Sequence, residues 1–543
     1  METKKSRRDF IKHACWLVAA SSAGLGRARA ADAKFVVADT AFGKIRGVDV
    51  EGIKIFKGVS YGASTAGTNR FMPPVNPVKW AGVRDALEFG PSAPQTEPGV
   101  RRRIPSARAV AAAGLPAESE DCLVLNVWTP AVADGKKRPV MVWLHGGGFS
   151  SGSGSSPVTD GSNLARRGDV VVVTVNHRLN VLGFTFLGEP GGAEFAASGD
   201  VGMLDLVRAL EWVRDNIAQF GGDPGTVTIF GQSGGGRKVG TLLAMPSARG
   251  LFHRAIIESG ATITLVEQAQ AAKVAVELLK RLELDGPRVR ELQKLPVERI
   301  MAAYFAVVRS MNVDQMTQGF SPTVDGKFVP HHPFHPTASA VSAEVPLMLG
   351  STRTELTSSA DAAAFTLNED GMRERIKTLL GADRAGGIID VYRKANPGAT
   401  PSDIYFLIAS DHRYSAPVMK IAERRTALGK GPVYLYYFRW ETPVDGGRLK
   451  SPHTIEIPFA FDNVKVASQL TGGGAEAMAL ADKVSDAWIA FARTGNPNTP
   501  KLPRWPAFNA VDRPTMVFNN QSKVENDPLR EQRLAMFRAM NLT

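Results

Sequence analysis

Cysteine is nearly absent from this chain. Only Cys15 and Cys122 occur among its 543 residues. Cys15 falls in an N-terminal segment that has the pattern of a removable leader, so the mature chain is left with the single thiol of Cys122. One thiol cannot form an intramolecular disulfide, and the fold must therefore be held together without one.

Long apolar runs, internal repeats and dense basic tracts are also missing. The stretch from Ala14 to Leu25 is too short and too polar to form a stable membrane span, and no other segment is a candidate. No Gly/Ser-rich linker marks a boundary, so we predict one domain over residues 31–543. The triplet Arg101-Arg102-Arg103 is isolated, which favours a solvated loop over a nucleic-acid-binding patch.

The first 30 residues have the pattern of an export signal. A twin arginine, Arg7-Arg8, precedes bulky apolar residues, and Ala28-Arg29-Ala30 offers a cleavage site. We predict a bacterial twin-arginine signal over residues 1–30, bound as a precursor by the twin-arginine export machinery, and a periplasmic or secreted mature protein. The alternative is a basic cytosolic tail. The seven Lys and Arg residues of this segment outnumber its two acids by five, so residues 31–543 carry +7 of the formal +12.

The most informative motif is G-x-S-x-G at the end of an apolar, β-rich segment. In residues 227–236, Val-Thr-Ile-Phe-Gly-Gln-Ser-Gly-Gly-Gly, Gly231 and Gly235 flank Ser233. Flanking glycines permit a turn too tight for side chains. Such a turn presents the serine hydroxyl to a base and to a substrate carbonyl, and the arrangement is a nucleophile elbow.

The segments around this motif alternate between strand and helix patterns. Residues 138–144 and 169–176 are continuous apolar runs, typical of central strands that are buried on both faces. Residues 204–220 have helical spacing of their apolar side chains. This alternation predicts a doubly wound sheet. Two largely helical stretches, 265–310 and 360–430, are expected to form cap or lid structures around the site.

An activated serine needs a base, and in a doubly wound hydrolase the base follows the serine and an acid along the chain. Only His412 and His453 lie far enough downstream. His412 falls in a helical pattern over 404–425. His453 falls in a loop, which we expect to precede the edge of a strand over 455–459, and it is therefore the preferred base.

The acid is expected to follow a buried strand. Residues 346–350, Pro-Leu-Met-Leu-Gly, predict such a strand, and Glu355 comes shortly after it. Asp325 is the alternative acid, but its Asp-Gly pair is typical of a turn. Glu355 is preferred, and Asp325 stays open as the second choice.

A third motif, His145-Gly146-Gly147-Gly148-Phe149, follows the predicted strand at 138–144. Glycine backbone N–H groups after such a strand are suited to binding an oxyanion, because side chains would block the approach of the carbonyl oxygen. A phosphate-binding loop is the rival interpretation, but the lysine and spacing of a P-loop are absent.

With these motifs in place the chain resembles the type-B carboxylesterases, the group that includes bacterial para-nitrobenzyl esterases and cholinesterases. The resemblance runs from about Gly43 to the C-terminus. Its most specific motif outside the elbow is Glu120-Asp121-Cys122-Leu123-Val124-Leu125-Asn126-Val127-Trp128. Further matching segments are Phe56–Tyr61, Arg70–Pro74, Gly221–Pro224, Phe491–Pro497 and Trp505-Pro506.

The resemblance implies an α/β-hydrolase fold with a large, mostly parallel central sheet, helices on both faces and helical cap or lid insertions. It implies a serine carboxylesterase that hydrolyses a small-molecule ester through an acyl-enzyme, without a cofactor or metal. The site residues that it implies are Ser233, Glu355 and His453 as the triad, Gly147, Gly148 and Gly234 as the oxyanion hole, and Ser259 and Gln232 as supporting groups behind them. A non-catalytic adhesion module of the same fold is the alternative, but such proteins typically lose the serine or the histidine.

Several positions depart from the family pattern. Family members commonly have Glu at the position of Gln232 and Ala at that of Gly234. The cysteine expected to pair with Cys122 is Ala93, and the aromatic residue of choline-binding relatives falls at Ala112. Without a carboxylate or an aromatic face beside the serine, we expect neutral esters to be preferred over choline esters.

The run His331-His332-Pro333-Phe334-His335 holds three of the nine histidines. No second group of ligands matches it in the sequence. A polar loop is therefore the preferred interpretation, and no metal site is predicted.

Overall fold

A computed structural model of the chain describes residues 34–99, 116–312 and 319–542. The predicted leader over residues 1–30, the arginine triplet at 101–103 and Ala112 lie outside the described residues.

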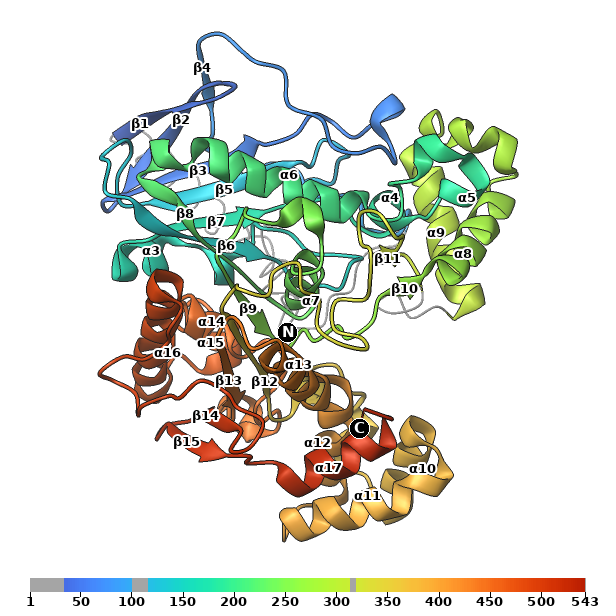
Figure 1. Cartoon of the computed structure of the whole chain (residues 1–543), viewed down its shortest axis with the longest axis vertical. Coiled ribbons are helices and arrows are strands. Elements are labelled where there is room, and N and C mark those ends of the chain that lie inside the picture. Colours follow the sequence, from blue (N-terminus) through green and yellow to red (C-terminus); the bar gives the residue numbers. More distant parts are fainter. Residues whose placement is uncertain (1–33, 100–115, 313–318, 543) are drawn as a thin grey trace, which may run out of the picture.

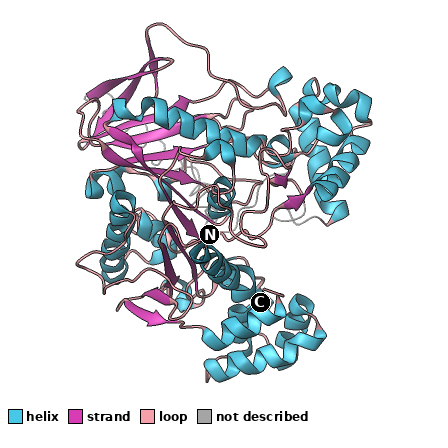
Figure 2. Ribbon diagram, in the orientation of Figure 1, coloured by secondary structure: helices cyan, strands magenta, loops and turns pink. Residues whose placement is uncertain are grey.

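One large sheet organises the chain (Figure 2). Its central strands are mutually parallel, and antiparallel strands extend it at both edges. The parallel strands are, in order across the sheet, β7 (Val171–Val175), β6 (Arg138–Leu144), β8 (Gly222–Gln232), β9 (Arg254–Glu258), β12 (Leu347–Thr352), β13 (Val433–Phe438) and β14 (Pro514–Phe518). The edges are β1 (Lys34–Thr40), β2 (Gly43–Val50), β3 (Ile53–Ser60) and β5 (Val124–Thr129) on one side and β15 (Lys523–Asn526) on the other, with β4 (Val83–Asp85) paired to β2. The predicted mostly parallel sheet is confirmed.

The continuous apolar sequence of β6 follows from burial on both faces of the sheet. Val140 and Val142 belong to one core cluster, whereas Met141 and Trp143 belong to another. Successive side chains of a strand point to opposite faces, so each cluster fills one side of the sheet. No position of β6 is left for a polar side chain that faces solvent.

Each core cluster is closed by helices (Figure 1). The first cluster contains Leu206 and Leu210 of α6 (Val201–Asn216), and the second contains Trp488 of α16 (Ala475–Thr494). Helices α3 (Ser162–Gly168), α7 (Gly234–Leu242) and α13 (Ala416–Ala427) also pack against the sheet. Shorter helical turns are α4 (Asn180–Phe184), α5 (Gly188–Gly191), α14 (Ile457–Ala460) and α15 (Ser468–Thr471).

The two stretches predicted as helical insertions are helical. The first forms α8 (Gln268–Arg281) and α9 (Val297–Met311), beside the small parallel pair β10 (Val266–Glu267) and β11 (Thr323–Val324). The second forms α10 (Glu369–Leu380), α11 (Ala382–Ala395), α12 (Pro401–Ser410) and α13 (Ala416–Ala427). In Figure 1 these two groups lie apart from each other, and α13 of the second group packs against β12 and β13.

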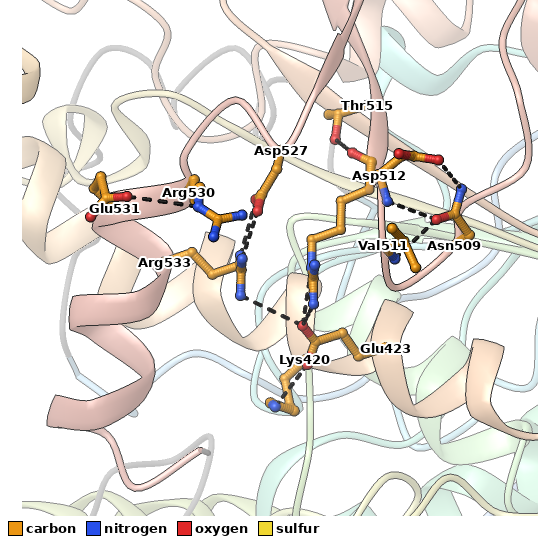
Figure 3. Close-up of polar contacts among 11 residues, drawn as sticks. Lys420, Glu423, Asn509, Val511, Asp512, Thr515, Asp527, Arg530, Glu531 and Arg533 are labelled. Carbon is orange, nitrogen blue, oxygen red and sulfur yellow. Dashed lines mark hydrogen bonds and ion pairs between the residues drawn. The ribbon is translucent and has the colours of Figure 1, made fainter.

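The last helix, α17 (Arg530–Ala539), is joined to the second helical group by charged side chains (Figure 3). Arg533 donates to both carboxylate oxygens of Asp527, at 3.0 and 2.6 Å, and lies 3.8 Å from Glu423 of α13. Glu423 also accepts hydrogen bonds from Lys420 and Arg513. This network ties the C-terminal segment to α13.

The prediction of a strand over 455–459 is wrong, because this segment contains the short helix α14 (Ile457–Ala460). Pro458 stands in the first turn of this helix, where a backbone N–H has no intrahelical acceptor, so proline removes no hydrogen bond. In a strand the same proline would remove a ladder hydrogen bond. The alternating apolar pattern reflects burial of Ile455 and Phe459, not a strand.

Cys122 is a free thiol with no exposed surface, and burial raises its pKa well above the ordinary value of a thiol. Ala93, at the position of the missing partner, is also buried. Within residues 34–99, 116–312 and 319–542, no helix combines the length and the apolar character that crossing a membrane would require.

Candidate active site

Ser233 lies on a strained turn between β8 and α7. Its backbone has φ 58° and ψ −121°, outside the regions that non-glycine residues usually adopt. A Cβ on Gly235 would lie 1.9 Å from the Leu144 carbonyl oxygen at the end of β6. Since no side chain fits in that space, the predicted need for glycine beside the serine is confirmed.

Glu355 and His453 meet at the carboxyl edge of the sheet. Nδ1 of His453 lies 2.5 Å from Oε2 of Glu355, whose other oxygen accepts the Thr352 N–H at 2.7 Å. Glu355 is wholly buried at the end of β12, and 15% of the His453 side chain is exposed. With Nδ1 donating to this carboxylate, Nε2 is the nitrogen that remains to accept a proton.

Two loops hold this pair together. The Ser451 carbonyl accepts the Thr354 N–H at 3.0 Å, and the Thr354 hydroxyl accepts the Ser451 N–H at 2.9 Å. The Ser451 hydroxyl in turn donates to the Phe438 carbonyl at the end of β13. The loops after β12 and β13 are thereby fastened to each other on either side of Glu355 and His453.

Gln232, the residue before the serine, touches His453 directly. Its side-chain nitrogen lies 3.2 Å from Nδ1 and 3.4 Å from Nε2 of the imidazole. No hydrogen bond joins the Ser233 hydroxyl to His453 in the described part of the chain, and such bonds are often loose before substrate binds. Gln232 therefore places a neutral amide, where the family commonly has a carboxylate, in contact with the imidazole.

The glycine loop after β6 packs against the same turn. A Cβ on Gly234 would lie 2.2 Å from the carbonyl oxygen and 2.4 Å from the nitrogen of Gly148. The space that an alanine would fill is thus occupied by the loop backbone. Gly147 and Gly148 have φ of 89° and 64°, and neither they nor Gly234 donate an N–H hydrogen bond to any described residue. These three N–H groups remain able to bind an oxygen.

Ser259 connects the site to a buried carboxyl group. Its hydroxyl donates to Oε1 of Glu456 at 2.7 Å, and its N–H donates to the Gly350 carbonyl. Burial raises the pKa of Glu456, and the nearby Glu355 adds to that effect. The sequence offered no sign of this pair, because Glu456 lies 197 positions after Ser259.

A second buried acid, Glu258, lies at the end of β9. It accepts a hydrogen bond from the Trp488 indole at 2.7 Å, and burial raises its pKa to about 8, with Glu456 contributing. Oε2 of each of these acids and the Tyr436 hydroxyl have no hydrogen-bond partner among the described residues. The raised pKa of Glu258 favours its protonated form at neutral pH.

The alternative candidates lie elsewhere. Asp325 accepts the N–H groups of Lys327, Phe328 and Val329, so it caps a turn as its Asp-Gly pair suggested. His412 belongs to a π-helical turn over 411–415, and burial lowers its pKa.

That turn nevertheless supplies a neighbour of the site that the sequence did not indicate. The ring of Tyr414 lies 4.8 Å from that of His453. In the run at 331–335, His332 pairs with Glu267 at 2.9 Å. Among the described residues no group of three or more His, Cys, Asp or Glu side chains could hold a metal ion.

Comparison with known proteins decides the class of enzyme. The profile of the carboxylesterase family matches residues 34–537. This chain belongs to the carboxylesterase family. Like other members it is a carboxylic ester hydrolase with an α/β-hydrolase fold, as the sequence motifs predicted.

Similar carboxylesterases cover almost the whole chain. A para-nitrobenzyl esterase of Bacillus subtilis is 34% identical over 505 residues, which are 92% of this chain and 98% of that protein. A phenmedipham hydrolase of Pseudarthrobacter oxydans is 33% identical over 92% of this chain and 98% of its own length. The crystal structure of a Geobacillus stearothermophilus carboxylesterase has a TM-score of 0.79 at 37% identity, over 92% of this chain and 99% of that one.

The buried acid Glu258 leads to a prediction about stability and pH. An unfolded glutamate ionises near pH 4.5, whereas folded Glu258 keeps its proton up to about pH 8. The folded state binds the extra proton in that window, so stability falls as pH rises, by at most about 1.4 kcal/mol per pH unit. Glu258→Gln cannot ionise and keeps an acceptor for Trp488. We expect its Tm to decline less than that of the wild type between pH 5 and pH 8.

Thermal unfolding at several pH values measures this difference. Glu88→Gln is the control, because Glu88 is exposed, and its Tm is expected to follow the wild type. Identical pH dependence of Tm in Glu258→Gln and the wild type would contradict the assignment of a protonated Glu258.

Proposed function

We propose that Ser233 is the nucleophile of a Ser-His-Glu triad, with His453 as its base and Glu355 as the acid. The observation that carries the proposal is the 2.5 Å contact between His453 Nδ1 and Glu355 Oε2 at the sheet edge that also bears the Ser233 turn. Ser233 attacks the ester carbonyl while Nε2 of His453 takes its proton. His453 then protonates the leaving alcohol, and Glu355 stabilises the imidazolium throughout.

The oxyanion of each tetrahedral intermediate is bound by the N–H groups of Gly147, Gly148 and Gly234. Two observations support this role. Gly148 lies close to Gly234, and the three N–H groups donate no hydrogen bond to any described residue. Water activated by His453 finally hydrolyses the acyl-enzyme. Ser259 and Gln232 are supporting groups behind the triad, and no cofactor or metal takes part.

Neutral esters are the proposed substrates. Gln232 lies against His453 as an uncharged amide, so this position offers no negative charge to a substrate cation. A quaternary ammonium group loses hydration on entering such a site and needs a carboxylate or an aromatic face in return. We therefore infer that acyl and alcohol groups without a positive charge are preferred.

We also propose that the mature protein is one domain, residues 31–543, that acts in the periplasm or outside the cell. One sheet contains strands from β1 to β15 and so spans nearly the whole described chain, which supports a single folding unit. The twin arginine and the Ala28-Arg29-Ala30 site support export of the precursor by the twin-arginine machinery and cleavage after Ala30.

Replacement of the triad residues tests the mechanism. Ser233→Ala and His453→Ala are each expected to lower kcat by about 10⁴-fold or more, as triad replacements do in serine hydrolases. His412→Ala is the matched control and should keep kcat near the wild-type value. The assay is hydrolysis of p-nitrophenyl butyrate, and circular dichroism checks that each variant folds. Loss of activity in His412→Ala, with His453→Ala active, would overturn the choice of base.

The preference for neutral esters is tested with two substrates of the same shape. We expect kcat/KM for 3,3-dimethylbutyl butyrate to exceed that for butyrylcholine. Gln232→Glu should shift the ratio toward the choline ester, because it adds a carboxylate beside His453. A tenfold preference of the wild type for butyrylcholine, about 1.4 kcal/mol of transition-state binding, contradicts the proposal.

Export is tested by replacing the twin arginine without changing its charge. Arg7→Lys with Arg8→Lys should reduce periplasmic esterase activity and cause precursor to accumulate. Lys4→Arg with Lys5→Arg keeps the twin arginine and serves as the control. The N-terminal sequence of the exported protein should begin near Ala31. Unchanged export of the Arg7, Arg8 variant would point to a different route.

A further inference from the structure

Helix α7 carries a lysine in its interior. Lys238 follows Ser233 by five positions and has no exposed surface. Its Nζ donates a hydrogen bond to the carbonyl oxygen of His145 at 2.8 Å, and to no other described residue. It forms no ion pair with any acid in the described ranges, so its charge is not neutralised by a partner.

The carbonyl that Lys238 holds belongs to the first residue of the glycine loop. His145 directly follows β6, and the next residues are Gly146, Gly147 and Gly148. This loop packs tightly on the serine turn, because a Cβ on Gly234 would lie 2.2 Å from the Gly148 carbonyl oxygen. A displacement at His145 would therefore move the N–H groups of Gly147 and Gly148.

Among the residues that the structure describes, no acid pairs with Lys238 to explain its burial. Its charge acts on His145 and His177, whose rings stack at 5.1 Å, and burial together with this charge lowers the pKa of both. Arg237 precedes it in α7. Behind His177 the charges of Arg178 and Asp205 pair with each other at 2.6 Å. Burial of an ammonium group without a carboxylate is unfavourable for folding, and it lowers the pKa of Lys238 to about 7.

We propose that Lys238 is a positioning residue for the oxyanion hole, whose Nζ–H holds the His145 carbonyl and thereby fixes the N–H groups of Gly147 and Gly148. This inference rests on the proposed function of those glycines. The protonated amine makes the stronger, charge-assisted hydrogen bond. The loop is accordingly held best while Lys238 carries its proton.

The central variant is Lys238→Met, which keeps the length and apolar stem of the side chain and removes the donor. We expect kcat for p-nitrophenyl butyrate to fall about 10- to 100-fold, less than the loss from removing an oxyanion donor itself. KM should change less than about threefold, because the ground-state carbonyl uses the loop less than the oxyanion does. Lys273→Met, on the exposed side of α8, is the control and should match the wild type.

Thermal stability separates this role from a merely structural one. Unfolded lysine ionises near pH 10.4, whereas folded Lys238 loses its proton at about pH 7. The unfolded state binds the extra proton between these values, so the unfavourable contribution of Lys238 to folding is largest below pH 7 and disappears as pH rises toward 10. Lys238→Met should therefore have a higher Tm than the wild type, most of all at pH 6, although its kcat is lower. A structural lysine would lower Tm and activity together.

The pH profile gives a second readout. Wild-type kcat should decrease as pH rises from 7 to 9, because Lys238 loses its charge in that range. The decrease should be absent from Lys238→Met, and Lys238→Arg, which stays charged, should retain activity at high pH. The acidic side of the pH profile should be the same in all three proteins.

Several results would overturn the inference. These are a kcat of Lys238→Met within twofold of wild type, a joint fall of its Tm and kcat, or a wild-type kcat that does not decrease between pH 7 and 9. The last measurement needs no variant, so it tests the inference even where Lys238→Met does not fold. Covalent labelling of Ser233 by an organophosphonate separates the two proposals: absence of labelling overturns the proposed function, whereas labelling at the wild-type rate in Lys238→Met overturns only the role of Lys238.

Discussion

The close packing of the serine turn against the end of β6 is the constraint on which the rest of the site depends. The Leu144 carbonyl oxygen leaves room for nothing larger than hydrogen on Gly235, and the Gly148 backbone does the same at Gly234. Backbone contacts of this kind leave little freedom, because neither partner can change rotamer to relieve a clash. The strained φ of Ser233 persists because β8, α7 and the glycine loop all hold it in place.

Around this rigid centre the carboxyl ends of the parallel strands supply the other groups. Glu355 follows β12, the glycine loop follows β6, and His453 lies in a segment after β13 that is tied back to the β12 loop through Ser451. Groups of distant sequence meet at this edge because parallel strands end there together. The sheet thus determines where chemistry is located, and the loops determine which side chains reach it.

Ionisable groups behind the site are buried in unusual states. Glu258 is protonated, Glu456 has a raised pKa, and Lys238 has a lowered one. Each lowers the stability of the folded chain over part of the pH range, because burial disfavours the charged form. The neutral Gln232 adds no charge beside His453.

The sequence by itself determined the enzyme class and most of the architecture. Apolar runs at 138–144 and 346–350 specify buried parallel strands, and the glycines around Ser233 specify a turn that other residues cannot form. These signals are local, so they can be recognised in a short stretch of chain. The prediction of a strand at 455–459 failed because burial alone can produce the apolar pattern of a strand. Pro458 also suits the first turn of a helix.

Only the tertiary structure decided which side chains meet. It brought His453, and not His412, against Glu355, and it assigned Asp325 to a turn. The basic pair Arg237-Lys238 resembles a solvated surface in sequence, yet Lys238 is wholly buried and bonded to a carbonyl 93 positions earlier. Contacts across such separations depend on how strands from the whole chain pack together. The same packing determines the burial that shifts each pKa, and no local pattern of residues predicts it.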